Sequence, residues 1–247
     1  MNIAKYIDST YLKTPEQSGL SAEETKEKVL ALASEADQYE LFAVMIRPEY
    51  VSSIKEYLTQ LESSVKVGTV IGFHTGTASL EDKLKEAEKA IADGADELDF
   101  VINFEAYKNG EVEYVEKEVV ECTRLGIAHG KVVKWIIEIA ALSNDQIEGI
   151  TALISKKAQE YFSSTERENI FVKSSTGFYP TTDGAPNGAT VEGIKLMKSN
   201  AGDLPLKAAG GVRTPKEAQE MIDLGVTRIG TSSALALLGN DVSSSDY

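Results

Sequence analysis

Short apolar runs alternate with longer amphipathic stretches along the whole chain. The apolar runs are rich in β-favouring residues and predict strands near residues 5–8, 41–46, 65–71, 97–102, 132–138, 170–173, 205–208 and 227–230. Apolar positions at helical spacing predict helices near residues 22–36, 49–61, 80–93, 112–125, 144–162, 190–198, 216–224 and 233–238. A strand is therefore followed by a helix throughout the sequence.

Residues typical of helix ends support these boundaries. Ser21 and Glu24 have the spacing of a capping box just before the first predicted helix. Pro215 suits the first turn of the seventh helix, where its missing N–H has no cost. Gly94, Gly126 and Gly225 follow predicted helices, and glycine commonly ends a helix.

The alternating order predicts an α/β fold, a single-domain (β/α)8 TIM barrel over residues 1–247. No linker rich in proline, glycine or serine divides the chain, and the loop after the first strand lacks the GxGxxG expected of a dinucleotide-binding sheet. The irregular stretch Phe178–Ala189 follows the sixth strand and is either a loop over the catalytic face or a tolerated insertion. Residues 240–247 are expected to form a flexible C-terminal tail.

Composition narrows the function classes. The net charge of −14 disfavours nucleic acid and anionic membranes as partners, since basic residues are not in excess. Cys122 is the single cysteine and His74 and His129 are the two histidines, so we expect no disulfide and no metal site. No apolar leader or membrane-length run is present, which predicts a cytoplasmic protein.

Four ionisable residues interrupt the predicted strands. Lys134 lies in VVKWII, Lys173 in IFVKSST, Lys207 in LPLKAAGG and Asp99 in ELDFVI. Side chains alternate along a strand, so each of these would point into the barrel while its apolar neighbours face the helices. Lys173 and Lys207 fall on consecutive strands near the carboxyl ends, which form the catalytic end of such barrels.

Lysines in such a place indicate Schiff-base chemistry. Burial and a second nearby ammonium lower the pKa of a lysine, and the neutral amine can attack a carbonyl carbon. Asp99 would bind the lysine that stays charged and help to transfer protons. Spacing alone leaves open which lysine attacks, and an ion network that only fills the barrel is the alternative.

Hydroxyl and glycine residues follow the last three strands, in 174–177, 209–213 and 230–233. Backbone N–H groups in loops after strands seven and eight are the usual phosphate site of a (β/α)8 barrel. Tight turns and N-caps would explain the same residues without a ligand. Their occurrence on consecutive units favours a phosphate site.

The whole chain resembles the deoxyribose-phosphate aldolase family. The resemblance rests on the segments YIDSTYLKT, GADELDFVIN, KVVKWIIE, FVKSSTGF, LKAAGGVRT, GTSSAL and a terminal tyrosine. It implies a class I aldolase that reversibly cleaves 2-deoxy-D-ribose 5-phosphate to acetaldehyde and D-glyceraldehyde 3-phosphate, with no cofactor and no metal. It also implies small phosphorylated sugar and aldehyde substrates as the partners; we further allow for a homodimer.

The resemblance also implies residue roles. Lys173 matches the family's Schiff-base lysine, Lys207 the lysine that perturbs it, and Asp99 the acid of the proton relay. Tyr247 matches a C-terminal tyrosine that assists proton transfer at the enamine carbon. The remaining substrate-binding residues are Asp8, Lys134, Thr176, Gly177, Gly210, Gly211, Gly230, Ser232 and Ser233.

Three other functions are weighed against this one. A transaldolase-like enzyme would use the same lysine chemistry on a ketose phosphate. A non-catalytic phosphosugar-binding barrel would use the phosphate-binding loops but would not need the lysines for catalysis. A phosphosugar isomerase needs a carboxylate base and an electrophile, and paired lysines do not suit it.

Overall fold

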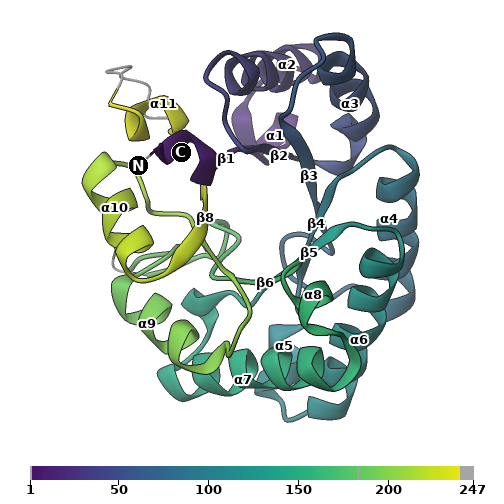
Figure 1. Ribbon diagram of the computed structural model, residues 1–247, viewed down its shortest axis with the longest axis vertical. Helices are drawn as coiled ribbons and strands as arrows, with labels where there is room; N and C mark the ends of the chain where they lie inside the picture. Colours follow the sequence, from purple (N-terminus) through teal and green to yellow (C-terminus); the bar gives the residue numbers. More distant parts are fainter. Residues whose placement is uncertain (1, 183, 240–247) are drawn as a thin grey trace.

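Eight parallel strands form a closed barrel in the computed structural model, which describes residues 2–182 and 184–239. Neighbours in the sequence are neighbours in the barrel, and β8 closes against β1 (Figure 1). The strands are β1 Ile7–Tyr11, β2 Ala43–Ile46, β3 Lys66–Ile71, β4 Glu97–Val101, β5 Val132–Ile136, β6 Ile170–Lys173, β7 Leu206–Ala209 and β8 Val226–Thr231. The predicted (β/α)8 barrel is confirmed.

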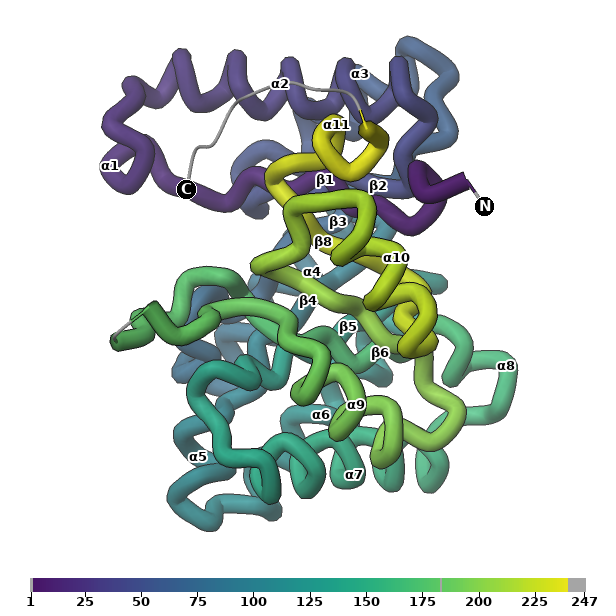
Figure 2. Tube along the Cα trace, turned by 90° about the vertical axis from the view of Figure 1, so that its left-hand side faces the viewer, coloured from purple at the N-terminus to yellow at the C-terminus, as the bar shows by residue number. Residues whose placement is uncertain are grey.

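Helices surround the strands, as the two views at right angles show (Figures 1 and 2). The predicted helices are α2 Ala22–Gln38, α3 Val51–Gln60, α4 Leu80–Ala92, α6 Val112–Ala128, α7 Asn144–Tyr161, α9 Val191–Asn200, α10 Pro215–Asp223 and α11 Ala234–Leu237. Short pieces that the pattern did not predict are α1 Pro15–Ser18, α5 Phe104–Lys108, α8 Ser164–Arg167 and the 3-10 turns η1 Ile3–Tyr6, η2 Pro48–Tyr50 and η3 Ile139–Ala141. None of the described helices has the length and apolarity needed to cross a membrane.

Several boundaries differ from the prediction by a few residues, and two of the differences have a clear physical reason. The first strand begins at Ile7 rather than residue 5, because the Asn2 side chain accepts from Ala4 N at 3.2 Å and caps a 3-10 turn there. Gly126 lies inside α6 and does not end it. A Cβ on Gly126 would lie 2.3 Å from Val133 Cγ2, so this glycine permits close packing of the helix on β5.

The apolar core lies between the strands and the helices. Trp135 and Phe100 are fully buried there and stack with ring centroids 5.3 Å apart, and Trp135 Nε1 donates to Thr123 Oγ1 at 3.0 Å. Each is flanked in its strand by a residue that points the other way, into the barrel. The outward positions thus supply the apolar packing, and the inward positions remain for charged groups.

The segment Phe178–Ala189 is irregular wherever it is described, as predicted, and it is tied to its neighbours. Asn187 Nδ2 donates to Gly177 O at 3.0 Å, and Ala189 N donates to Gly210 O at 3.0 Å. A Cβ on Gly188 would lie 2.4 Å from the backbone carbon of Gly210, so only glycine permits this approach. The segment therefore packs on the loop after β7.

Candidate active site

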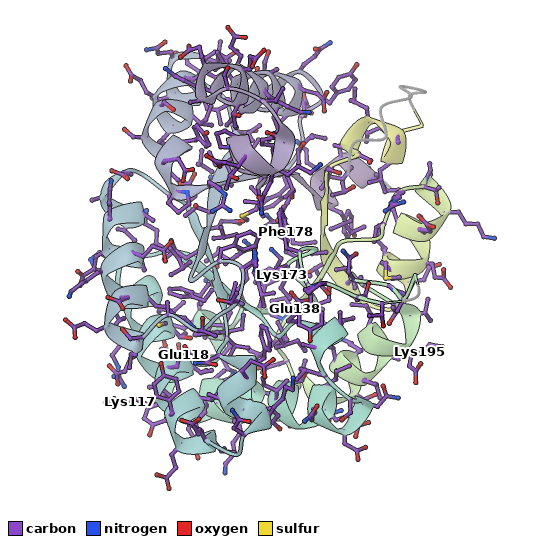
Figure 3. All side chains as sticks on the ribbon, turned by 180° about the vertical axis from the view of Figure 1, so that it is seen from behind. Lys117, Glu118, Glu138, Lys173, Phe178 and Lys195 are labelled. Carbon is purple, nitrogen blue, oxygen red and sulfur yellow. The ribbon has the colours of Figure 1, made fainter. Side chains whose placement is uncertain are left out.

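Three lysines converge on one carboxylate inside the barrel. Lys134 Nζ lies 2.6 Å from Asp99 Oδ1, and Lys173 Nζ and Lys207 Nζ each lie 2.9 Å from Asp99 Oδ2. Since both of the latter amines bond the same oxygen, they are at most twice that distance apart. All four side chains are buried, and Lys173 is near the centre of the molecule (Figure 3).

Strand register brings these residues together. Lys173 pairs with Lys207 across β6 and β7, and Asp99 pairs with Lys134 across β4 and β5. Paired residues of parallel strands present their side chains to the same face. The inward direction inferred from alternation is therefore what the barrel shows.

A second group of charges lies beside the first. Lys207 Nζ is 2.5 Å from Asp8 Oδ2, and Arg228 Nε donates to Asp8 Oδ1 at 2.8 Å. Glu97 accepts from Lys134 Nζ at 2.7 Å and from both terminal nitrogens of Arg228, at 2.9 and 2.8 Å. Sequence reasoning missed Glu97 and Arg228. The detectable signal was that Glu97 precedes Asp99 by two positions and so shares its face of β4.

The network has one more cation than it has carboxylates. Its cations are Lys134, Lys173, Lys207 and Arg228, and its carboxylates are Asp8, Glu97 and Asp99. A surplus charge in a buried place is unfavourable, and loss of one proton removes it. The arrangement therefore favours one neutral amine.

Electrostatics identify Lys173 as that amine. Burial lowers the pKa of Lys173 to about 8; the Asp99 carboxylate opposes this, and the charges of Lys207 and Lys134 add to it. Burial also acts against the charged form of Lys134, yet Asp99, Glu97 and Asp8 raise its pKa above the usual value. Spacing alone left the attacking lysine open, and the family resemblance implied Lys173. Sequence reasoning stressed the neighbouring cation as the cause of the lowered pKa, whereas burial is the larger cause.

The two carboxylates between the cations stay ionised. Burial works against this, but Lys134, Lys173 and Lys207 together lower the pKa of Asp99 well below its ordinary value. Burial likewise opposes the ionised form of Asp8, and Arg228 and Lys207 nevertheless lower its pKa to about 2. Asp99 therefore remains a charged hydrogen-bond acceptor for all three amines.

The lowered pKa of Asp8 makes part of the stability pH-dependent. A carboxyl whose pKa is lower in the folded state stabilises the fold above its ordinary pKa of 3.8, and this contribution is lost as the pH falls through 2. The expected contribution is on the order of 2 kcal/mol. Urea unfolding at several pH values should show the stability gap between wild type and Asp8→Asn shrinking below about pH 4. The exposed Asp145→Asn serves as control, and a gap for Asp8→Asn that stays constant down to pH 2 would contradict the prediction.

The loops after β6, β7 and β8 carry the predicted phosphate-binding residues. Gly177, Gly210 and Gly211 all have left-handed backbones, with φ of 80°, 74° and 78°. Ser232 and Ser233 follow β8, and Ser233 is the N-cap residue of α11, which has only four residues. These loops meet at the carboxyl end of the barrel, beyond Lys173 at the end of β6.

Two other predicted substrate-binding residues, Gly230 and Thr176, also have structural roles. Gly230 lies within β8, and a Cβ there would be 3.2 Å from Lys207 Cε, so glycine makes room for that lysine. Thr176 is buried and bonds to Glu138, a residue that sequence reasoning also missed. Tyr247 and the tail 240–247 lie outside the described residues.

An apolar wall faces the interior on the β1–β3 side. Met45 and Val70 are buried with Leu12, and Phe73 and Phe178 pack against them with ring centroids 5.1 Å apart. Val70 is paired with Asp99 in the barrel, which places its side chain on the inward face. The interior is therefore charged on one side and apolar on the other.

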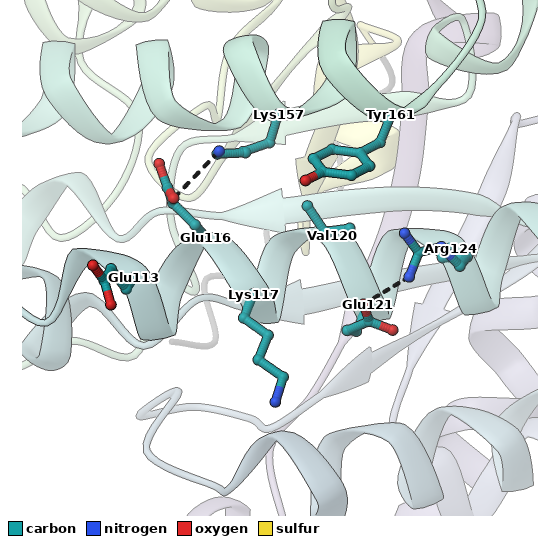
Figure 4. Close-up of a pocket in the computed structure, with 8 residues that line it drawn as sticks. All are labelled: Glu113, Glu116, Lys117, Val120, Glu121, Arg124, Lys157 and Tyr161. Carbon is teal, nitrogen blue, oxygen red and sulfur yellow. Dashed lines mark hydrogen bonds and ion pairs between the residues drawn. The ribbon is translucent and has the colours of Figure 1, made fainter.

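Other places on the molecule lack this chemistry. A hollow of about 260 Å³ lies between α6 and α7 (Figure 4), where Lys157 pairs with Glu116 at 3.2 Å and Arg124 with Glu121 at 2.6 Å. Among the described residues, no three histidine, cysteine or acidic side chains are grouped so as to hold a metal ion.

Comparisons with known proteins agree with the geometry. Residues 3–240 match the model of the DeoC/LacD family of aldolases. The deoxyribose-phosphate aldolase of Thermococcus gammatolerans is 41% identical over 239 residues, 96% of each chain, and that of an Exiguobacterium species is 40% identical over the full length of both. A solved tetrameric deoxyribose phosphate aldolase of Aeropyrum pernix is 31% identical, with a TM-score of 0.77 over 96% of this chain and 89% of its own. The chain belongs to the DeoC/LacD family of aldolases.

Proposed function

We propose that this protein is a class I aldolase that reversibly cleaves 2-deoxy-D-ribose 5-phosphate to acetaldehyde and D-glyceraldehyde 3-phosphate through a Schiff base on Lys173. The observation that carries the proposal is the convergence of Lys173, Lys207 and Lys134 on Asp99 at the catalytic end of the barrel. The names of full-length relatives about 40% identical support the substrate.

The first step uses the neutral amine of Lys173. Its Nζ adds to the C1 aldehyde of the open-chain sugar, and loss of water gives an iminium ion. With its pKa near 8, Lys173 has a useful fraction of free amine at neutral pH, which an ordinary lysine lacks. The adjacent Asp99 carboxylate stabilises the positive charge of the iminium.

The second step breaks the C2–C3 bond. Removal of the C3 hydroxyl proton, by way of Asp99, Lys207 and a water molecule, releases D-glyceraldehyde 3-phosphate, and the bond's electron pair moves into the iminium to form an enamine. Lys207 can transfer a proton because its amine bonds both Asp99 and Asp8. Protonation of the enamine at C2, for which we propose the help of Tyr247, and hydrolysis then give acetaldehyde and free Lys173.

The substrate phosphate would bind at the loops after β6, β7 and β8. We assign it to Thr176, Gly177, Gly210, Gly211, Gly230, Ser232 and Ser233, with Asp8 and Lys134 lining the sugar pocket. The left-handed glycines expose backbone N–H groups to an anion, which supports this assignment. We further infer that the chain acts in the cytoplasm and as a homo-oligomer, at least a homodimer, in keeping with the tetrameric Aeropyrum pernix protein.

Acetaldehyde release separates this function from its rivals. Purified enzyme supplied with 2-deoxy-D-ribose 5-phosphate should release acetaldehyde and D-glyceraldehyde 3-phosphate in equal amounts, which coupled dehydrogenase assays measure. A transaldolase-like enzyme would instead act on ketose phosphates and release no acetaldehyde. Binding of the sugar phosphate without turnover would favour a non-catalytic barrel.

A further inference from the structure

Glu138 is a buried acid in an uncommon backbone conformation. It lies two residues after the end of β5, its side chain is fully buried, and its backbone lies in the left-handed region at φ 59° and ψ 68°. Residues other than glycine rarely adopt this region, and such conformations persist where the surrounding structure enforces them, often at functional sites. Neither the Schiff-base chemistry nor the barrel packing described above uses this carboxyl.

Its contacts lead to the loop that follows the attacking lysine. Thr176 N donates to Glu138 Oε2 at 3.1 Å, and the Thr176 hydroxyl donates to the same oxygen. Thr176 Oγ1 in turn accepts from Phe178 N at 3.0 Å. Glu138 therefore fixes Thr176, and with it the backbone on either side of Gly177.

The backbone on both sides of Glu138 is held by the last residue of β6 and the residue after it. Ile137 N donates to Lys173 O at 3.0 Å and Ile139 N donates to Ser174 O at 2.9 Å. These bonds keep Glu138 beside the end of β6, and Figure 3 shows Glu138 close to Lys173, the last residue of that strand. The left-handed turn thus directs one carboxylate oxygen to the Thr176 backbone.

We propose that Glu138 is a positioning residue that holds the 174–178 loop in the form that binds the substrate phosphate, and that it does so best when the carboxyl is neutral. The proposal rests on the proposed function, because it assumes that the phosphate binds at Thr176 and Gly177. A negative charge directly behind that loop would repel a phosphate dianion, whereas a neutral carboxyl accepts the same two hydrogen bonds.

The surroundings of Glu138 support a change of charge near neutral pH. Burial raises its pKa to about 7; the hydrogen bonds from Thr176 and the charge of Lys173 oppose this. Its other carboxylate oxygen, Oε1, has no hydrogen-bond partner among the described residues, which leaves an atom free to carry a proton. Lys173 links Glu138 to the charges inside the barrel, since its amine bonds Asp99, which also bonds Lys134 and Lys207. On the α9 side, Glu192 accepts from Asn144 Nδ2 at 2.7 Å.

One variant tests whether Glu138 positions the 174–178 loop, and a second tests whether its charge matters. Glu138→Gln keeps an acceptor oxygen for both Thr176 donors but cannot ionise, and Glu138→Ala removes the acceptor. We would measure kcat/KM for 2-deoxy-D-ribose 5-phosphate and for unphosphorylated 2-deoxy-D-ribose between about pH 6 and pH 8, together with borohydride trapping of acetaldehyde on Lys173. The substrate phosphate titrates in the same way for the wild type and both variants. A difference between their pH profiles is therefore due to Glu138.

We expect Glu138→Ala to lower kcat/KM for the phosphorylated sugar roughly tenfold or more relative to the unphosphorylated one, with trapping retained. The wild type should lose preference for the phosphorylated sugar as the pH rises through about 7, and Glu138→Gln should keep it. Equal losses for both sugars in Glu138→Ala would show a merely structural role and overturn the proposal. If Glu138→Ala does not fold, a Glu138→Gln profile identical to that of the wild type overturns it. A wild type that releases no acetaldehyde would instead refute the proposed function.

Discussion

Lys173→Ala is expected to abolish turnover and to prevent borohydride trapping of acetaldehyde. The variant lacks the amine that must bond to C1, whose pKa burial lowers to about 8, whereas Lys134 is held protonated by three carboxylates. We expect kcat to fall by more than roughly a thousandfold. Mass spectrometry after borohydride treatment should find the added ethyl group on Lys173 in the wild type.

The control for this experiment is Lys195→Ala, since Lys195 is an exposed lysine of α9 away from the network. That variant should retain both turnover and trapping. An ethyl adduct on another lysine of the wild type, or substantial turnover by folded Lys173→Ala, would show that the Schiff base forms elsewhere.

Lys207→Met is expected to move the acid limb of the pH–rate profile upward and to slow the reaction. The charge of Lys207 is one cause of the lowered pKa of Lys173, and its loss leaves the Asp99 carboxylate free to favour the protonated amine. The pKa of Lys173 should therefore rise from about 8, by on the order of one unit. Loss of the proton relay should cost a further hundredfold or more in kcat, by order of magnitude.

Trapping and turnover respond differently in this variant. At high pH the Lys173 amine of Lys207→Met is free again, so acetaldehyde trapping should recover while turnover stays low. Circular dichroism would verify folding, because the variant also deprives Asp8 of an ion pair at 2.5 Å. A kcat/KM profile that overlays that of the wild type would exclude any influence of Lys207 on the attacking amine.

The hydrophobic periodicity of the sequence was sufficient to predict the barrel fold. Apolar runs located all the strands to within two residues at their starts, because each strand buries its outward face under helices. Short elements such as α5 and α8 escaped the pattern, since four or five residues contain too little of a helical period to detect. Gly126 was misjudged because a glycine that permits close packing and one that ends a helix look alike in sequence.

The proposed active site could be predicted only in part, for a different reason. Lys173, Lys207, Lys134 and Asp99 stand out because each interrupts an apolar run. Glu97 and Arg228 lie near the starts of their strands, beside Asp96 and Thr227, where a charge is typical of an exposed strand end. Barrel closure buries them against each other, and that contact joins residues 131 positions apart.

The ion network also divides the chain into two unlike halves. Its three carboxylates all come from β1 and β4, and its four cations all come from β5 to β8. A fragment ending before β5 would carry only the network's carboxylates toward its centre, and the complementary fragment only the network's cations. Neither could fold as a self-sufficient half-barrel, but the two should attract each other strongly, so this enzyme is suited to reassembly from two separately made pieces.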